Sequence, residues 1–486
     1  MDDGVSATAL YGQAMGLRDR LHVVIAGGGV AALETLLALR ALAADLVDVI
    51  LVSPKTEFVY RPVTVAEAFD RAEARVYDLA EVLADQGGGE LIHDSLADVE
   101  ARSRIAVTGS GRRISYDALV VATGAVPRTP FPGAFAFRGR DDVPVLRSVL
   151  HDLTAGRAQS VALALPSERV WPLPLYELAL MTAGHVSEHA GGDVKVTLVT
   201  PEEEPLELFG PAATEAVRSL LTARGIAIRS SSLPAMVRGR TLLLAGGSEI
   251  FADRVITLPV SEGPRLPGLP HDQHGFIPVD KFGRVSGLDH VYAAGDITAF
   301  PLKQGGLAAQ QADAAAEAIA ATAGALITPQ PFRPVLRGLL LTGGAPLYLR
   351  AEPQRLTREA TVAIEAPASH RPSREASAAS GQALWWPPAK IAGRYLAPYL
   401  ATARPSLMGE GVLADRMPVP GAPISDEEQQ DALALALLLA DCDARWGDYA
   451  SALNALDAAE ALQGALPPDY EAKRREWHAE DRLAHG

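Results

Sequence analysis

The sequence predicts an α/β fold, because short apolar strands run into glycine-containing turns at three widely spaced places. These places are residues 23–32, 116–125 and 291–296. A strand, a glycine turn and a helix in immediate succession are typical of a dinucleotide-binding unit. Further apolar strands at residues 161–165 and 194–199 indicate a second unit of the same kind. We therefore predict two Rossmann-like dinucleotide-binding domains, followed by a C-terminal lid and hairpin region and a helical hairpin.

The first glycine turn has the residues that a bound pyrophosphate requires. Gly27 lets the chain turn tightly, and Gly29 lets backbone amides approach a phosphate without an intervening side chain. Ala32 is small enough for the following helix, at about residues 30–43, to pack close to the strand, and its N-terminal amides then point at the phosphates. An ordinary strand–turn–helix is the alternative for this element alone. The residues expected to bind the cofactor here are Gly27, Gly28, Gly29, Val30, Ala31 and Ala32.

The second strand, at residues 48–52, departs from the usual pattern. Such a strand normally ends in an acidic residue that binds the ribose hydroxyls, whereas here it leads to Ser53 and Lys55. Ser53 can bond a hydroxyl and Lys55 can reach a phosphate. Without the acid, we expect adenosine to be held less tightly than the glycine turn alone suggests.

Two segments, residues 58–62 and residues 295–312, carry a resemblance to a known family. The chain resembles the two-dinucleotide-fold flavoproteins of glutathione-reductase type over about residues 20–325. Within them it is most similar to the sulfide:quinone oxidoreductase and type-2 NADH dehydrogenase branch. The resemblance implies FAD as cofactor, with Asp296 holding its ribityl or phosphate part. The remaining residues expected to bind FAD are Ser53, Lys55, Arg61, Leu96, Ala122, Thr123, Gly124, Gly295, Asp296, Lys303, Gly306 and Leu307.

Lys303 has a chemical reason to lie near the flavin. Reduced flavin carries negative charge at its N1/C2 carbonyl end. A helix that begins near Leu307, with a lysine just before it, would stabilise that charge and favour two-electron reduction. The alternative is a surface lysine at the start of a helix.

The chain has a single cysteine, Cys442. Sulfide:quinone oxidoreductases and disulfide reductases work through a pair of cysteines beside the flavin, and one thiol cannot form a redox disulfide. We therefore do not expect sulfide oxidation by the usual covalent route, and interpret Cys442 as a buried structural residue. The lack of disulfides suits a cytoplasmic setting. The histidines are scattered, so we expect no metal site.

The turn of the second unit lacks glycine. Residues 166–177 contain three prolines and Trp171. Such a backbone cannot come close to a pyrophosphate, and proline removes amide donors. Acids at residues 202–204 can accept a ribose hydroxyl but would repel a 2′-phosphate, so NADPH is disfavoured and NADH remains possible. Trp171 either plugs the vacated site or stacks on a planar acceptor.

Composition limits the partners. The 486 residues carry 44 basic and 59 acidic side chains, a net charge of −15, which argues against nucleic acid or an anionic bilayer. The apolar content of 48% is that of a globular protein. We see no secretion signal, and the longest apolar run is too short to cross a membrane. Membrane contact is therefore expected to be peripheral at most.

The expected organisation has six parts. Residues 384–400, which include Trp385 and Trp386, form either a lid over the flavin or a membrane-touching surface. The C-terminal part resembles one helix-turn-helix unit of tetratricopeptide repeats, and packs on the body, self-associates or docks a protein partner. The parts are a flexible tail (1–20), the first part of the FAD domain (21–150), an NAD(P)-like domain (151–262), the second part of the FAD domain (263–327), the hairpin and lid region (328–420) and the helical hairpin (425–486).

The resulting hypothesis is an FAD-dependent oxidoreductase that passes electrons through the flavin without a redox disulfide. Its small-molecule acceptor would be a quinone or another planar redox molecule. A type-2 NAD(P)H dehydrogenase and a flavin-binding scaffold that acts through its C-terminal helices are the alternatives. The residue pattern assigns no catalytic residue.

Overall fold

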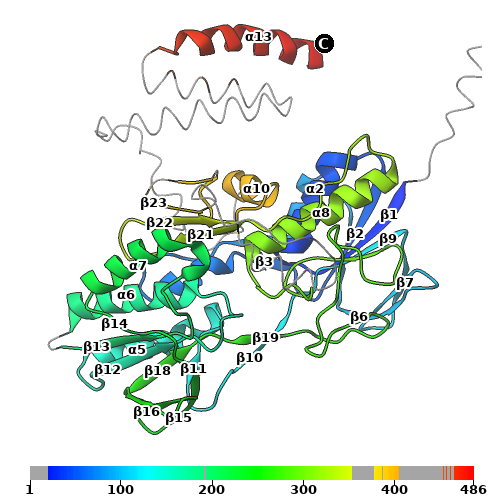
Figure 1. Cartoon of the computed structure of the whole chain (residues 1–486). Helices are drawn as coiled ribbons and strands as arrows, with labels where there is room; N and C mark the ends of the chain where they lie inside the picture. The colour runs from blue at the N-terminus through cyan, green and yellow to red at the C-terminus, as the bar shows by residue number, and fades with distance from the viewer. Residues whose placement is uncertain are drawn as a thin grey trace, which may run out of the picture. The chain divides into compact units, whose positions relative to one another are not determined.

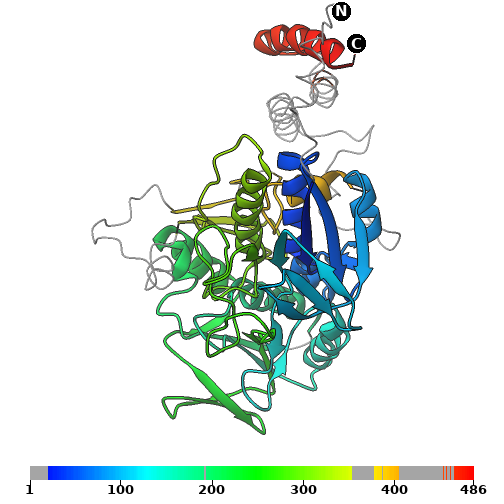
Figure 2. The same ribbon diagram turned by 90° about the vertical axis from the view of Figure 1, so that its right-hand side faces the viewer.

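The first parallel sheet has the strand order β20-β9-β1-β2-β5. Helices α2 (Val30–Ala43) and α8 (Gly305–Ala323) lie side by side against one of its faces (Figures 1 and 2). Its strands are β1 (Leu21–Ala26), β2 (Val47–Ser53), β5 (Glu90–His93), β9 (Ala118–Val121) and β20 (Val291–Ala293).

The structure is a computed structural model, and it describes residues 20–190, 193–352, 377–381, 383–385, 387–403, 453, 456, 460 and 465–485. The chain divides into two units, residues 1–412 and 413–486. Residues 1–19 of the expected N-terminal tail lie outside the described residues. Trp386 and Cys442 also lie outside them.

Alternation along β1 shows why its sequence is apolar throughout. Val23 and Ile25 are buried with α2 and α8, whereas Val24 and Ala26 are buried on the opposite face. That second face is covered by a three-stranded antiparallel sheet. A strand buried on both faces needs apolar side chains at every position. The covering strands are β6 (Leu96–Glu100), β7 (Ile105–Thr108) and β8 (Arg113–Ser115).

The second parallel sheet has the order β11-β18-β12-β13-β14. With the first sheet it confirms the predicted α/β fold with two Rossmann-like domains. Its strands are β11 (Phe135–Ala136), β12 (Ser160–Ala164), β13 (Lys195–Val199), β14 (Ala227–Arg229) and β18 (Arg254–Thr257). Its helices are α5 (Val143–Thr154), α6 (Leu173–His189) and α7 (Pro211–Ala223), and a separate antiparallel sheet comprises β15 (Pro234–Arg238), β16 (Thr241–Leu244) and β17 (Glu249–Phe251).

The chain passes between the two domains along one antiparallel pair. Strand β10 (Val126–Arg128) leads from the first domain to the second, and β19 (Val260–Glu262) leads back beside it (Figure 1). The remaining elements of the first domain and its border are β3 (Glu57–Val59), the 3-10 turn Arg61–Val63, α3 (Thr64–Glu67), β4 (Val76–Asp78) and α4 (Leu79–Asp85).

The hairpin expected within residues 328–420 is present. Strands β21 (Leu336–Leu340) and β22 (Leu347–Ala351) pair antiparallel, and β23 (Ser377–Ser380) extends the sheet. Helix α10 (Leu396–Thr402) follows, and the buried carboxylate of Glu34 on α2 accepts hydrogen bonds from the amides of Tyr395 (2.7 Å) and Leu396 (2.8 Å). An acid on the first helix of the chain therefore caps the N-terminus of α10.

The unit at residues 413–486 contains α13 (Pro468–His485), a helix that the sequence reading did not identify. Proline is well suited to the first position of a helix, because its missing amide would have no partner there. Asp469 and Glu471 in the first turn complement the helix dipole. Most of the expected helical hairpin, at residues 425–464, lies outside the described residues.

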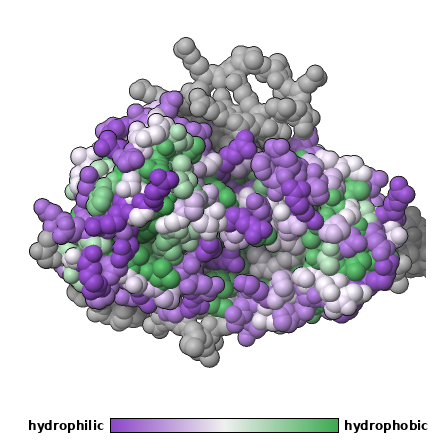
Figure 3. Space-filling view, turned by 90° about the horizontal axis from the view of Figure 1, so that it is seen from below, coloured by the Kyte–Doolittle hydropathy of each residue, from purple (hydrophilic) through white to green (hydrophobic). Residues whose placement is uncertain are grey.

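In the ranges that the structure describes, no helix is long and apolar enough to span a bilayer. On the face seen in Figure 3, hydrophilic residues surround smaller apolar patches.

Candidate functional site

The three glycine-containing turns predicted from the sequence meet at one edge of the first sheet. Strands β1, β9 and β20 are parallel neighbours, so their carboxyl ends lie together. The amide of Ala122 donates to the carbonyl of Ala26 (2.8 Å), and that of Ala294 donates to Val121 (3.1 Å). The amide of Gly295 donates to the buried side chain of Gln311 on α8 (2.8 Å), which fixes the turn before Asp296.

The first turn has the shape of a phosphate cradle. Gly27 has a φ of +140°, and a Cβ there would lie 2.2 Å from the carbonyl oxygen of Ala122, so only glycine fits. Gly29 is exposed, and a Cβ there would meet no heavy atom within 4 Å. Gly29 is also the N-cap of α2 and supplies no side-chain cap. The first amides of α2 therefore face open space, as an incoming pyrophosphate requires.

Two of the expected FAD ligands, Ser53 and Leu96, are buried. Ser53 is buried beneath Gly28, and its hydroxyl donates to the carbonyl of Lys55 (2.7 Å) and accepts from its amide (3.2 Å). The structure thus gives Ser53 a role in holding the turn, and its hydroxyl hydrogen is already used. Lys55 is exposed, and Leu96 is buried in the core under the sheet. Their contacts with FAD stay predictions.

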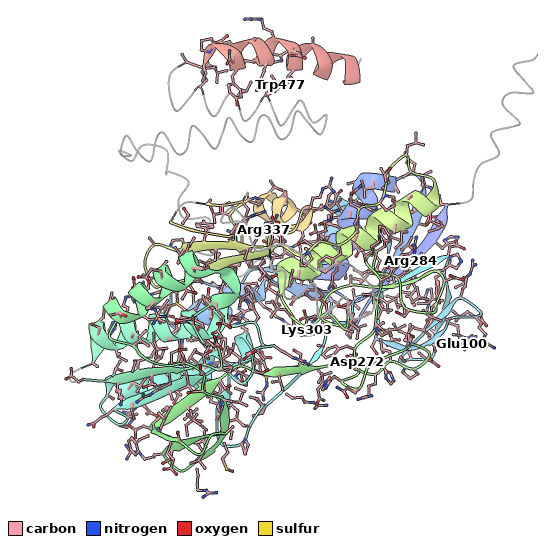
Figure 4. All side chains as sticks on the ribbon, viewed as in Figure 1. Glu100, Asp272, Arg284, Lys303, Arg337 and Trp477 are labelled. Atoms are coloured by element: carbon pink, nitrogen blue, oxygen red, sulfur yellow. The ribbon has the colours of Figure 1, made fainter. Side chains whose placement is uncertain are left out.

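A cavity of about 1040 Å³ lies next to this edge, and both Rossmann-like domains line it. Three predicted residues, Arg61, Asp296 and Lys303, are brought together in its wall. Figure 4 labels Lys303 and Asp272 from this wall, together with Arg337 of β21. Of the expected cofactor-binding residues, Arg61, Asp296 and Lys303 line the cavity, whereas residues 27–32 and 122–124 of the first two glycine turns are not part of its wall.

Helix α8 begins at Gly305, close to Leu307, where its start was expected. The side chain of Gln304 caps the helix by accepting a hydrogen bond from the amide of Leu307 (2.7 Å). Gly305 lines the cavity, whereas Gly306 and Leu307 are buried in the first turn.

Lys303 is not a surface lysine. Its ammonium donates to the carbonyls of Thr298 (2.5 Å) and Phe300 (2.7 Å) and lies 3.8 Å from the ring centre of Phe276. Burial lowers the pKa of Lys303 to about 8, partly opposed by Asp296. Burial raises the pKa of Asp296, opposed by the positive charge of Lys303 and of Arg61. The site therefore holds a cation and a carboxylate in the partly buried cavity wall, where each acts more strongly on a bound charge than it would in bulk water.

The turn between β12 and α6 is unsuited to a second pyrophosphate. Pro172 is the N-cap of α6 and Pro174 lies in its first turn, so amides that would bind phosphate are missing. The amide of Val170 is already bonded to the carbonyl of Ser167 (3.1 Å). The indole of Trp171 lies in the cavity wall, edge-on to Phe209 at 5.7 Å, and leaves the cavity beside it open.

Glu202, the first of the acids expected to meet a ribose, is turned inward. Its carboxylate is buried and accepts hydrogen bonds from the hydroxyls of Tyr176 (2.5 Å) and Thr200 (2.8 Å). Burial raises its pKa to about 7. Its Oε2 is therefore engaged within the domain, and Glu203 and Glu204 are the exposed acids of the three.

A buried ion pair escaped the sequence analysis. Glu177 on α6 is 0% exposed, and its Oε1 lies 2.5 Å from the ammonium of Lys390, which lines the cavity. The same oxygen accepts from the amide of Leu341 (2.9 Å), and Oε2 has no partner among the described residues. Burial raises the pKa of Glu177 and lowers that of Lys390, and each partner opposes the shift of the other. The two residues are 213 positions apart, so no local pattern could have joined them.

Only part of the segment expected to form a lid borders the cavity. From this segment Lys390 and Ile391 form cavity wall, and the amide of Ile391 donates to the hydroxyl of Tyr60 (3.0 Å). The indole of Trp385 packs edge-on against Tyr348 of β22 at 5.2 Å and is not part of the wall. Among the described residues there is also no group of three or more side chains suited to hold a metal ion.

The chain is similar to several known proteins. It is 25% identical over 302 residues to the oxidoreductase ptaL of Pestalotiopsis fici, covering 57% of this chain and 77% of the relative. It is 28% identical over 296 residues to an NADH dehydrogenase-like protein of Mycobacterium tuberculosis, covering 57% and 73%. The sulfide-quinone reductase of Aquifex aeolicus is 25% identical, with 58% and 69% covered.

Solved structures show the same fold. The sulfide:quinone oxidoreductase of Aquifex aeolicus superposes with a TM-score of 0.63 at 21% identity, over 68% of this chain and 84% of that one. A ferredoxin reductase of Rhodopseudomonas palustris gives a TM-score of 0.52 at 20% identity, over 68% and 82%.

The family model described as pyridine nucleotide-disulphide oxidoreductase matches residues 21–163 and 176–320. The unmatched stretch between the two segments is the glycine-free turn that carries Trp171. Members of this family are FAD-dependent oxidoreductases that bind FAD and NAD(P)H. The chain therefore belongs to the pyridine nucleotide-disulphide oxidoreductase family and is an oxidoreductase.

Proposed function

We propose that the chain is an FAD-dependent oxidoreductase that exchanges electrons with a quinone or another planar acceptor through the flavin alone. The observation that carries this proposal is a cavity beside the cofactor edge whose wall holds Lys303, Asp296 and Lys390 but no cysteine. The only cysteine of the chain is Cys442. The chemistry must therefore use charge and proton transfer rather than thiol exchange.

The chain's own residues fit FAD. Gly27 and Gly29, with the N-terminus of α2, would hold the pyrophosphate, and Asp296 would accept from the ribityl chain. Lys303 and the N-terminus of α8 would lie at the pyrimidine edge. When bound, FAD supplies two-electron transfer. A positive charge at this edge favours the reduced cofactor, because reduction places negative charge there.

Lys390 and Glu177 are suited to handle the proton that accompanies quinone reduction. The ammonium of Lys390 faces the cavity, and the carboxylate behind it is fully buried. Because burial disfavours its charge, the Lys390 ammonium can give a proton to the acceptor, and the neutral amine then takes a proton back from the cavity, since the ionised Glu177 has none to donate and favours the return of the ammonium. The pair would thus hold a proton beside the acceptor without direct contact with bulk water.

An NADH dehydrogenase is the second candidate. The second Rossmann-like sheet is complete, and the relative in Mycobacterium tuberculosis is named NADH dehydrogenase-like. Against it stand the prolines at the start of α6 and the inward-turned Glu202. We propose that nicotinamide binding is weak, that the donor is another small molecule, and that the reaction takes place in the cytoplasm, as the absence of disulfides suggests.

An anaerobic absorbance titration tests the proposal. We expect purified protein to carry FAD, to be bleached by dithionite, and to be bleached slowly or not at all by NADH and NADPH. Rapid bleaching by NADH would mean that the glycine-free turn still binds nucleotide, and would favour the dehydrogenase. Protein that contains no flavin and takes up none would contradict the proposal and leave a scaffold role.

A further inference from the structure

The segment that brings Lys390 to the cavity forms a strap between the two Rossmann-like domains. The strap consists of residues 387–396 and leads into α10. Toward its start, the ammonium of Lys390 meets Glu177 on α6 of the second domain, at 2.5 Å. The amide of Ile391 then donates to the hydroxyl of Tyr60 in the first domain (3.0 Å). The position of Lys390 therefore depends on how the strap is fixed to the first domain.

The other end of the strap is fixed by one buried acid of α2. Glu34 is fully buried, and its two oxygens accept hydrogen bonds from the amides of Tyr395 (2.7 Å) and Leu396 (2.8 Å). The strap backbone also passes so close that a Cβ on Gly393 would lie 2.3 Å from Oε2 of Glu34. Both carboxylate oxygens are thus engaged by the strap, and Glu34 cannot turn away without releasing it.

A second acid faces the first. Asp313 on α8 lies within hydrogen-bonding reach of the Glu34 carboxylate. Its Oδ1 is buried and has no donor among the described residues. Two facing carboxylates cannot bond to each other while both are ionised, whereas one carboxylic acid donates well to one carboxylate. We therefore expect the pair to share one proton, carried by Asp313, because both oxygens of Glu34 already accept amide hydrogens.

Charged and titratable groups from three elements surround this pair. The guanidinium of Arg394 lies 3.1 Å from the carboxylate of Glu317, which is one turn along α8 from Asp313. With Glu34, three carboxyl groups meet here against two guanidinium groups, so a further negative charge is unfavourable. The groups that face the pair are Glu317 of α8, Arg394 and Tyr395 of the strap and Arg337 of β21.

The shared proton determines how firmly this junction holds. Burial and the negative charge of Glu34 raise the pKa of Asp313. A carboxyl group with a raised pKa in the folded state contributes stability that is present below its unfolded pKa and is lost as the pH rises through the folded value. Helices α2 and α8 share many buried alanines, whereas the strap joins this core through Ile391, Tyr395 and Leu396. We therefore expect the strap to give way before the two helices separate.

We propose that Glu34 and Asp313 are positioning residues that, by sharing one proton, hold the strap on the first domain and so keep the Lys390 ammonium in the cavity wall. The inference rests on the proposed function, in which Lys390 gives a proton to the acceptor. Ionisation of Asp313 releases the strap at Tyr395 and displaces Lys390. The reaction with the acceptor then slows at alkaline pH, although every side chain of the cavity wall is still present.

Hydrogen exchange of the strap amides tests the attachment without any reaction. It is followed by mass spectrometry on the FAD-loaded full chain from pH 6 to pH 10, with intrinsic exchange rates divided out. We expect protection of the amides of Tyr395 and Leu396 to fall about five- to thirtyfold as the pH rises, the range that the loss of a helix cap covers. Asp313→Asn keeps a donor to Glu34 at every pH and should stay protected. Asp45→Asn, which changes an exposed acid just beyond α2, is the matched control and should behave as wild type.

Reoxidation of the photoreduced flavin by a water-soluble quinone tests the link to Lys390. At pH 6, Glu34→Ala should lower the limiting rate about tenfold and leave the half-saturating quinone concentration little changed, since a positioned proton donor contributes about a hundredfold or more. In a Lys390→Met background the same substitution should have no further effect, because the group that Glu34 positions is gone. Asp313→Asn should remove the alkaline fall of the limiting rate. Flavin content is measured in every sample.

Two results would overturn the inference. One is strap protection that does not change with pH in the wild type, or that is lost equally in Asp313→Asn. The other is a Glu34→Ala effect on the rate that is as large in the Lys390→Met background as in the wild type. If Glu34→Ala does not fold, the pH profiles of wild type and Asp313→Asn decide alone. A Lys390→Met chain that reacts as fast as wild type would contradict the proposed role of Lys390, and the exchange measurement would still decide whether the two acids hold the strap.

Discussion

The buried pair of Lys390 and Glu177 makes a prediction whose size and pH dependence both follow from the structure. In Lys390→Met, the carboxylate of Glu177 loses the ammonium at 2.5 Å and keeps only the amide of Leu341, with no access to water. Removing one partner of a buried pair typically costs about 3–5 kcal/mol of the free energy of unfolding. We expect the full cost only where Glu177 is still ionised.

The pH dependence has a definite sign. Burial already raises the pKa of Glu177 above its ordinary value of 4.5, and the loss of Lys390 removes the main opposing influence. A carboxyl group with a raised pKa in the folded state contributes stability that is present below its unfolded pKa and is lost as the pH rises through the folded value. Lys390→Met should therefore be close to wild type at pH 5 and most destabilised at pH 8.

The assay is urea unfolding of FAD-loaded protein, followed by circular dichroism at pH 5, 6, 7 and 8. Lys281→Met, which removes an exposed lysine, is the matched control and should shift the midpoint little at any pH. The double variant Glu177→Gln, Lys390→Met should recover much of the loss and be insensitive to pH. A loss for Lys390→Met that is the same at pH 5 and pH 8, or no larger than that of the control, would refute the reasoning.

Three further predictions concern single residues. Asp296→Ala should yield mostly FAD-free protein, because the turn fixed by Gln311 loses its only carboxylate, and full FAD occupancy in the purified variant would show that the assignment is wrong. Lys303→Met should lower the reduction potential of the bound flavin by roughly 20–40 mV, which corresponds to about 1–2 kcal/mol for a two-electron couple, and an unchanged potential in spectroelectrochemistry would place Lys303 away from the flavin. Glu202→Gln should leave steady-state activity intact. Burial raises the pKa of Glu202 to about 7, so in the wild type its stabilising contribution is lost as the pH rises through that value. The free energy of unfolding of Glu202→Gln, taken relative to wild type, should therefore be roughly 2–3 kcal/mol more favourable at pH 8 than at pH 5. A large loss of NADH-dependent activity in Glu202→Gln would contradict its internal role.

The cofactor edge could be predicted because its signals are local in the sequence. Gly27 indicates a tight turn and Gly29 a backbone that a phosphate can approach, and both lie within a few residues of one strand. The structure shows the turn at Gly27 and the open space beside Gly29. Strand β1 is apolar at alternate positions on both faces, which identifies it as a central strand. The absence of glycine from the second turn was equally visible in the sequence. In the structure, prolines stand at the start of α6, where amides would otherwise bind a phosphate.

The substrate side could not be predicted, because its residues come from segments far apart in the chain. Arg169, Arg337 and Lys390 each look ordinary in their own context, and only the fold places them around one cavity. Glu202 shows the reverse case. Its position at a strand end suggested a ribose ligand, but Tyr176 and Thr200 turn it inward, and neither partner is apparent from the strand pattern.

The most direct test of the account is the anaerobic reaction of the photoreduced, FAD-loaded chain with a water-soluble quinone, followed by stopped-flow absorbance in wild type and in Cys442→Ser. If electrons pass through the flavin without a thiol, the oxidised flavin spectrum should return with quinone in both proteins at the same rate, and faster than NADH reduces the resting protein. A reduced protein that does not react with quinone, or a reaction that is lost in Cys442→Ser, would contradict thiol-free electron transfer through the flavin.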